Sequence, residues 1–140
     1  MAIEFESVSN FVLAEHDRYK EWLFSVVQNE GFSIGELNYI FCDDEYLLGI
    51  NKQYLDHDTF TDIITFDYTE GKVVSGDVFI STERVAENAV LFHQDFNTEL
   101  LRVIAHGVLH LMGYKDKEDA DVVLMRAKEE EKIKMFHVEQ

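Results

Sequence analysis

The chain has 140 residues with a single cysteine, and 28 Asp and Glu against 12 Lys and Arg give it a formal net charge of −16. With 46% hydrophobic and 13% aromatic residues it is too apolar to be disordered, and its length suits one folded domain, which we expect to span residues 1–140. The negative charge excludes a general nucleic-acid-binding surface, although a bound cation and a few basic side chains can still make one cleft attractive to phosphate.

Segments with the composition of strands alternate along the chain with segments of helical period. In chain order, the expected elements are a strand over 3–7, a helix over about 14–28, a strand over 35–42, a helix from 44 to about 54, strands over 62–68 and 72–81, and helices over about 82–92, 98–112 and 120–136. The two neighbouring strands are joined at Glu70-Gly71, which predicts an antiparallel hairpin. The predicted fold class is α+β, a single domain with a small mixed β-sheet packed by helices.

Local signals mark the ends of several of these elements. Asp43 or Asp44 supplies an N-cap for the second helix, Thr98 suits a helix start, and Gly113 suits a helix stop. Gly76-Asp77 interrupts the second hairpin strand. A bulge with an exposed charge is the simpler expectation there, and a close approach of backbone beside a useful carboxylate is the alternative.

Two histidines lie four residues apart on the expected helix over 98–112. At about 3.6 residues per turn, His106 and His110 project from the same face, which is the spacing that two imidazoles need to share one metal ion. Gly113 lets the chain turn back after the helix, so that Asp116 can bring a carboxylate to the same ion. Two histidines and one carboxylate leave a position open for water, as in a catalytic zinc site.

A histidine pair on an apolar helix also has an ordinary structural explanation, since such side chains are often hydrogen-bonded core residues. Two features favour the metal. Burying two imidazoles on an otherwise apolar helix is costly unless something binds them. Gly107 also costs roughly 1 kcal/mol of helix stability relative to Ala, which is explained if another backbone or a substrate approaches closely there.

The residue after the first histidine separates this helix from one class of enzyme. Metalloproteases with an HExxH helix place their general base, a glutamate, at the position that Gly107 occupies here. A conventional peptidase is therefore disfavoured. Hydrolysis must use water activated by the metal, a base from another segment or the substrate itself.

Three separate motifs resemble one known family. HGVLHLMGYKD, at 106–116, is similar to the HGxLHLxGYDH signature of the YbeY-type single-strand-specific endoribonucleases. TDIITF at 61–66 resembles the family's TDVLSF, and SGDVFIS at 75–81 resembles its LGDIVIS. The order and spacing of the motifs also agree, and the resemblance runs from about Leu37 to Lys132.

The resemblance implies an α+β fold, one zinc ion per chain, and cleavage of single-stranded RNA in rRNA maturation and ribosome quality control, especially at the small-subunit 3′ end. It also implies a bacterial, cytoplasmic protein. His106 and His110 match the family's first two ligand histidines, whereas Asp116 stands at its third and Lys115 replaces its usual Asp. Compared with the family's third histidine, a carboxylate ligand acidifies metal-bound water less and makes the site less selective for zinc. Another divalent ion such as manganese therefore becomes a plausible occupant.

A second departure from the family lies at 54–58, where this sequence has YLDHD and the family commonly has YRGKD. Leu55 occupies the position of an arginine that is thought to meet the RNA. The candidates to replace it as a phosphate contact are His57, Lys52 and Lys115, although exposed His and Lys side chains are more often solvated surface.

Three further side chains are candidates for the site, two of which, Arg102 and Asp62, we predict as catalytic. Thr61 and Asp62 precede a strand and are placed to hydrogen-bond a ligand imidazole or to line the cleft, unless Asp62 only caps a turn. Arg102 lies one turn before His106 on the same helix face. That position suits a bidentate contact to phosphate, a place in solvent or an ion pair with Glu99.

The remaining features concern the surroundings of the protein and its competing functions. Cys42 cannot form an internal disulfide, residues 1–10 lack the features of a secretion signal, and no apolar run reaches the length of about 18 residues that a membrane span needs. We therefore expect a cytoplasmic protein. Two hypotheses compete with the endoribonuclease: a ribosome-assembly factor with a structural metal, whose charge attracts basic ribosomal proteins, and a zinc hydrolase of another substrate.

Overall fold

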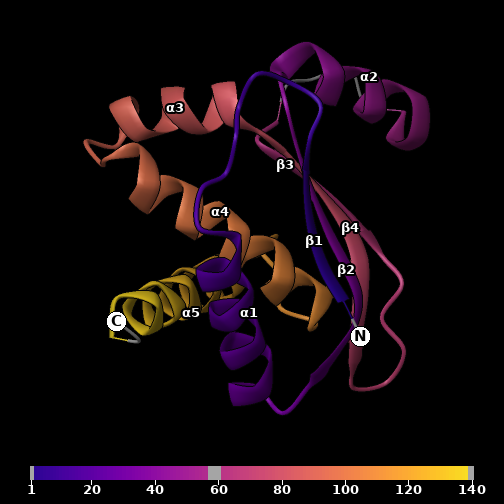
Figure 1. The fold of residues 1–140 in the computed structure, drawn as a ribbon, viewed down its shortest axis with the longest axis vertical. Helices are drawn as coiled ribbons and strands as arrows, with labels where there is room; N and C mark the ends of the chain where they lie inside the picture. The colour runs from indigo at the N-terminus through magenta and orange to yellow at the C-terminus, as the bar shows by residue number, and fades with distance from the viewer. Residues whose placement is uncertain (1, 57–60, 139–140) are drawn as a thin grey trace.

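The computed structural model describes residues 2–56 and 61–138. Within these ranges the chain forms four strands and five helices: β1 (Ala2–Ser7), α1 (His16–Asn29), β2 (Ser33–Cys42), α2 (Asp44–Leu55), β3 (Ile63–Asp67), β4 (Val73–Ser81), α3 (Thr82–Leu91), α4 (Phe96–Leu111) and α5 (Asp119–Val138) (Figure 1). The types and the order of the elements agree with the sequence prediction. The expected α+β class is confirmed.

The sheet is mixed, with the strand order β1-β2-β4-β3. β1 pairs with β2 and β2 with β4 in parallel, whereas β3 and β4 form the predicted antiparallel hairpin. A bridge between Glu70 and Val73 closes the hairpin, and Gly71 takes a φ of 58° that glycine adopts without strain. β2 and β4 lie in the middle of the sheet, and along most of each strand buried residues alternate with partly exposed ones.

Helices cover both faces of the sheet. α1, α4 and α5 lie together on one face, where α4 packs on β3 and β4 and α1 packs on β2 (Figure 1). The largest core cluster fills the space between these helices and the sheet. α2 covers the opposite face, where Leu47 packs with Cys42 and Ile64. This arrangement places α4 against the sheet on one side and against α5 on another.

Gly107 sets how closely α4 approaches the sheet. A Cβ at this position would lie 2.9 Å from Val78 Cγ1 and 3.1 Å from Ile63 Cδ1. Something does approach Gly107 closely, as the sequence suggested, but the partners are side chains of β3 and β4 rather than a backbone or a substrate. The glycine is explained by the packing of the helix that carries the histidines.

The bulge expected at Gly76-Asp77 lies in the neighbouring strand instead. The register of β2 against β4 shifts between residues 34 and 37, on the β2 side. A Cβ on Gly76 would lie 2.5 Å from the carbonyl oxygen of Phe66, so the alternative of a close backbone approach is correct. Asp77 is not an exposed charge either, because it is half-buried and accepts a 3.0 Å hydrogen bond from Asn38 Nδ2.

α4 begins two residues earlier than the predicted start at Thr98. Asp95 is its N-cap and accepts hydrogen bonds from the Thr98 backbone N–H at 2.7 Å and from Thr98 Oγ1 at 3.1 Å. Thr98 therefore belongs to the first turn, and the aspartate satisfies the free amides. The predicted cap of α2 is correct, since Asp43 accepts from the backbone N–H of Tyr46 at 2.8 Å.

Candidate metal centre

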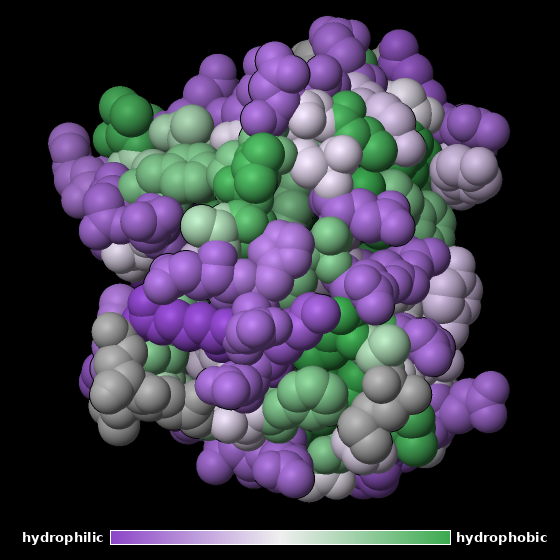
Figure 2. Space-filling model, viewed as in Figure 1, coloured by the Kyte–Doolittle hydropathy of each residue, from purple (hydrophilic) through white to green (hydrophobic). Residues whose placement is uncertain are grey.

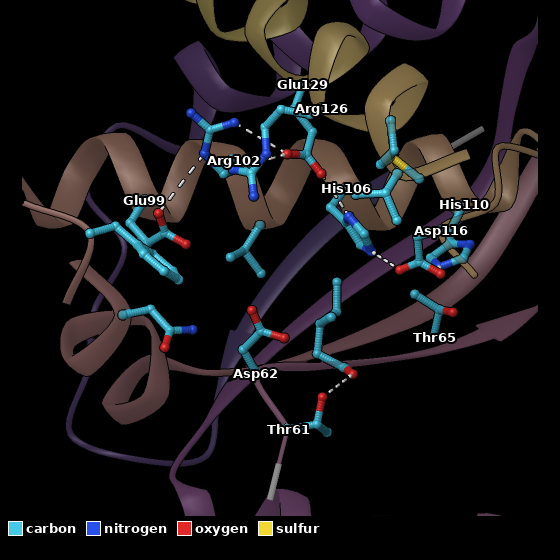
Figure 3. A pocket seen from close by; sticks show the side chains of 16 residues that line it. Thr61, Asp62, Thr65, Glu99, Arg102, His106, His110, Asp116, Arg126 and Glu129 are labelled. Atoms are coloured by element: carbon cyan, nitrogen blue, oxygen red, sulfur yellow. Dashed lines mark hydrogen bonds and ion pairs between the residues drawn. The ribbon is translucent and has the colours of Figure 1, made fainter. Parts of the chain in front are cut away.

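α4 and the turn after it bring the three predicted ligands together. His106 and His110 lie on the same face of α4, and Gly113, with a φ of 100°, turns the chain back toward them. Asp116 Oδ2 lies 3.2 Å from His106 Nε2, and Asp116 Oδ1 lies 3.5 Å from His110 Nε2. One ligand atom of each residue lies within 4.8 Å of the other two (Figure 3). Across residues 2–56 and 61–138, this is the one such group of possible metal ligands.

The donor set fits a divalent metal ion. Two imidazole nitrogens and one carboxylate oxygen are accepted zinc ligands, and ligand atoms about 2.1 Å from a tetrahedral ion lie roughly 3.4 Å apart. The two distances from Asp116 oxygens to the histidine nitrogens, 3.2 Å and 3.5 Å, are of this size. His106 and His110 are half-buried, while 38% of the Asp116 side chain is exposed. The group is therefore anchored in the protein on one side and open on the other.

Glu129 on α5 orients the first histidine. Its Oε2 lies 2.7 Å from His106 Nδ1, and only 6% of its side chain is exposed. Because a carboxylate accepts, Nδ1 carries the proton and Nε2 is left free to face Asp116. A carboxylate that holds the second nitrogen of a ligand imidazole fixes both its tautomer and its orientation.

Sequence reasoning missed Glu129, although a signal for it exists. On the last helix, Met125, Glu129, Ile133 and Phe136 recur at spacings of three and four, and all four are buried. A glutamate on an apolar stripe needs a partner. Helical period alone therefore marks Glu129 as unusual, but it does not say which residue it meets.

Opposing effects act on the pKa of His106. Burial lowers this pKa, but the hydrogen bond to Glu129 and the negative charges of Glu129, Asp116 and Asp62 outweigh burial and raise it above 6.5. The surroundings thus stabilise positive charge at this imidazole. The same negative potential favours a metal cation between the three ligands.

Arg102 lies one turn before His106, and its guanidinium faces carboxylates rather than open space. It pairs with Glu129 at 3.2 Å, with Glu130, and with Glu99 at 3.9 Å, while only 10% of its side chain is exposed. The ion pair with Glu99, one of the three alternatives for this residue, is therefore present. Arg102 offsets the buried charge of Glu129 and holds its carboxylate in place (Figure 3).

The ligands open into a cleft of about 480 Å³, which α4, α5, the end of α3 and the start of β3 line. Figure 3 shows Thr61 and Asp62 across this cleft from Arg102 and Glu129. Thr61 Oγ1 donates to the carbonyl oxygen of Ile63 at 3.4 Å and not to a ligand imidazole. Burial raises the pKa of Asp62, and the nearby His106 opposes that shift. Asp62 is thus a carboxyl group with a raised pKa that is not one of the predicted metal ligands but lines the same cleft.

The turn that presents Asp116 is tied to the far end of α1. Tyr114 donates through its hydroxyl to Glu30 Oε1 at 2.6 Å. Glu30 in turn accepts from Lys132 at 2.7 Å and from Lys128 at 3.0 Å, both on α5. This cluster fixes the turn against two helices, and it was not foreseen from the sequence.

The cations proposed to replace the missing arginine lie elsewhere or outside the described ranges. Lys52 and Lys115 are exposed and are not among the residues that line the cleft. Leu55 is 42% exposed at the end of α2. His57 falls outside the described residues.

Comparison with known proteins identifies relatives of the whole chain. A family model described as Endoribonuclease YbeY matches residues 4–137. Proteins named Endoribonuclease YbeY from Flavobacterium johnsoniae and Flavobacterium psychrophilum are 57% and 56% identical to this chain over 138 residues, which is 99% of this chain and 99% of each relative.

A solved structure is also similar. The solution structure of a Thermotoga maritima protein superimposes with a TM-score of 0.71 and 28% sequence identity, and the match covers 99% of this chain and 91% of the other. In the described part of this chain, every helix is too short or too polar to cross a membrane.

Proposed function

Because this chain belongs to the YbeY family of endoribonucleases, we propose that it cleaves single-stranded RNA at a metal centre held by His106, His110 and Asp116. The observation that carries the proposal is the position of His106. Its Nδ1 is held by Glu129 while its Nε2 lies 3.2 Å from Asp116, at one end of an open cleft. Such a cleft can accept an extended strand, whereas a closed structural metal site does not need one.

Zinc or another divalent ion bound by these ligands would polarise a phosphoryl oxygen and acidify a bound water. The chain's own residues divide the remaining work. Glu129 keeps Nε2 of His106 directed at the ligand group, and Arg102 keeps Glu129 in position. Asp62 is the candidate to take up or release a proton, since burial raises its pKa and it faces the cleft.

The proposed substrate in the cell is ribosomal RNA, cut in the maturation of the small-subunit 3′ end and in ribosome quality control. Support for this comes from the three family motifs and from relatives of nearly equal length. An enzyme of rRNA works where ribosomes are assembled, which in a bacterium is the cytoplasm. The net charge of −16 favours contacts with basic ribosomal proteins, and these are the proposed protein partners.

The test is cleavage of a labelled single-stranded RNA by the metal-loaded protein, with a duplex of the same sequence as a second substrate. We expect His110→Ala and Asp116→Ala to lose bound metal and to lower the cleavage rate by at least about a hundredfold. His137→Ala, an exposed histidine near the end of α5, is the control and keeps full activity. Equal rates in the wild type and both ligand variants contradict the proposed site.

A purified wild-type protein that holds one metal ion per chain, unfolds when the ion is chelated, and cleaves no RNA supports the assembly-factor hypothesis instead. The comparison of metal content, unfolding temperature and cleavage on the same preparation separates the two.

A further inference from the structure

The cleft contains a second arginine, Arg126 on α5, that differs from Arg102 in its surroundings. The Arg126 side chain is 59% exposed and lines the cleft. Its ion pair among the described residues is a long one, 3.9 Å from Nη1 to Glu129 Oε1. At that distance and exposure an ion pair contributes little, so the guanidinium remains available to a ligand.

Arg102 cannot serve the same purpose without losing its present contacts. It is buried and engages three carboxylates, and withdrawing it would remove the arginine that lies nearest to the buried carboxylate of Glu129. Arg126, by contrast, is exposed, and its ion pair with Glu129 is long. In a chain whose net charge repels polyanions, an exposed cation beside the metal ligands is the side chain suited to hold a phosphate.

The position of Arg126 relative to the ligands follows from the helix. It precedes Glu129 by three residues, so the two share a face of α5 and lie about one turn apart. Glu129 contacts His106, and Figure 3 shows Arg126 beside Arg102 on the α5 side of the cleft. A phosphate bound by Arg126 would therefore lie close to the metal centre but not on it.

Apolar side chains also line the cleft near Arg126. Val122, one turn before Arg126, and Phe92, at the end of α3, both line the cleft and are 44% and 53% exposed. Figure 2 shows hydrophobic side chains gathered over the end of α3, where Val90 and Leu91 are also exposed. A cation next to exposed apolar surface matches the alternation of phosphate and base in a single strand, which free phosphate does not offer.

We propose that Arg126 is a substrate-binding residue of this cleft and contacts a backbone phosphate adjacent to the one at the metal centre. The proposal rests on the proposed function, since it names a contact for the same substrate. A guanidinium can hold such a phosphate through two parallel hydrogen bonds, which a lysine cannot reproduce.

The test compares Arg126→Gln and Arg126→Lys with Lys134→Gln, which removes one exposed positive charge from the same helix at a position outside the cleft. We expect Arg126→Gln to raise KM for single-stranded RNA about tenfold with kcat within about twofold, and Arg126→Lys to recover only part of the loss. The slope of log affinity against log salt, measured by fluorescence anisotropy with a 2′-O-methyl oligonucleotide, falls by about 0.7 in Arg126→Gln and stays constant in Lys134→Gln. Metal content and unfolding temperature remain those of the wild type.

Three outcomes overturn the proposal. The first is a wild type that cleaves RNA while Arg126→Gln keeps both its KM and its salt slope. The second is loss of metal in Arg126→Gln, which assigns the residue to positioning Glu129. The third is weaker binding of inorganic phosphate with unchanged oligonucleotide affinity. A wild type that binds the oligonucleotide through Arg126 but cuts no RNA contradicts the proposed function and leaves this contact standing.

Discussion

His106 Nδ1 donates to Glu129 Oε2 across 2.7 Å, and this contact joins two helices that the chain order separates by a turn. It makes α5 part of the metal centre even though none of the three ligands lies on that helix. The consequence is that substitutions on α5 can change metal affinity without touching a ligand.

Glu129→Gln tests that consequence directly. We expect it to weaken metal binding about 10- to 100-fold, because a neutral amide supports the ligand imidazole less well than a carboxylate does. The measurement is competition for zinc against a chromogenic chelator. Glu118→Gln, an exposed glutamate just before α5, serves as the charge-matched control. Equal zinc affinities for the two variants would show that Glu129 does not act on the site.

Asp116→His examines the residue in which this chain departs from its family signature. An imidazole in place of the carboxylate shifts the donor set toward softer nitrogen ligands, so we expect the ratio of bound zinc to bound manganese to rise. Elemental analysis after equilibration with equal concentrations of both ions gives the ratio. A ratio that stays constant or falls indicates that Asp116 does not set metal preference.

The cluster around Glu30 predicts how stability depends on pH. Burial raises the pKa of Glu30, but hydrogen bonds from Lys132, Tyr114 and Lys128 outweigh it and lower the pKa from 4.5 to about 2. A carboxyl whose pKa is lower in the folded state stabilises the fold above its unfolded pKa. This stabilisation is lost as pH falls from about 4.5 toward 2.

Urea unfolding at several pH values between about 2 and 6 measures this effect. We expect the wild type to lose roughly 1 to 3 kcal/mol from this group across the window, and Glu30→Gln to have lower stability at neutral pH with a flatter pH profile. Parallel profiles for the two proteins would show that the Glu30 cluster does not contribute this pH dependence.

Gly107→Ala tests the close approach of α4 to the sheet. The new Cβ would lie 2.9 Å from Val78 Cγ1, so the expected loss of about 1 to 2 kcal/mol reflects crowding that exceeds the gain in helix propensity. Gly49→Ala on α2 is the matched control, since its Cβ meets nothing within 4 Å, and it is expected to stabilise the protein by about 0.5 to 1 kcal/mol.

Equilibrium unfolding of Gly107→Ala in a Val78→Ala background completes that test. Removing the Val78 methyl groups relieves the contact, so Gly107→Ala costs less there than in the wild type. If the two substitutions lower the free energy of unfolding additively, the contact between residues 107 and 78 is not the cause of the loss.

The local elements could be predicted from the sequence because their causes are local. Each of these signals involves residues that are close in sequence: the helical period, the Asp43 cap and the turn at Glu70-Gly71. The histidine ligands could be predicted for the same reason, since His106 and His110 are only four residues apart. The predicted start of α4 was two residues too late, because Asp95 and Thr98 are both good capping residues and only the structure distinguishes them.

What could not be predicted depends on packing between distant segments. The partner of Glu129 and the difference between Arg102 and Arg126 follow from how α4 meets α5, and the position of the bulge follows from how β2 pairs with β4. Both residues are arginines on helices, and the sequence alone does not show how their surroundings differ. One is buried among carboxylates and the other faces the cleft because of the neighbours that the fold gives them.

The hydrogen bond from Tyr114 to Glu30 spans 84 residues of sequence. It means that the position of the turn carrying Asp116 depends on how the end of α1 and α5 pack together, since Glu30 also accepts from Lys128 and Lys132 of α5. Bringing segments so far apart in sequence together costs loop-closure entropy, which the packing of α1 and α5 must offset. The three ligands themselves span only residues 106–116, so the ion closes a short local loop, whereas the placement of that loop relative to the rest of the molecule depends on a contact between distant segments.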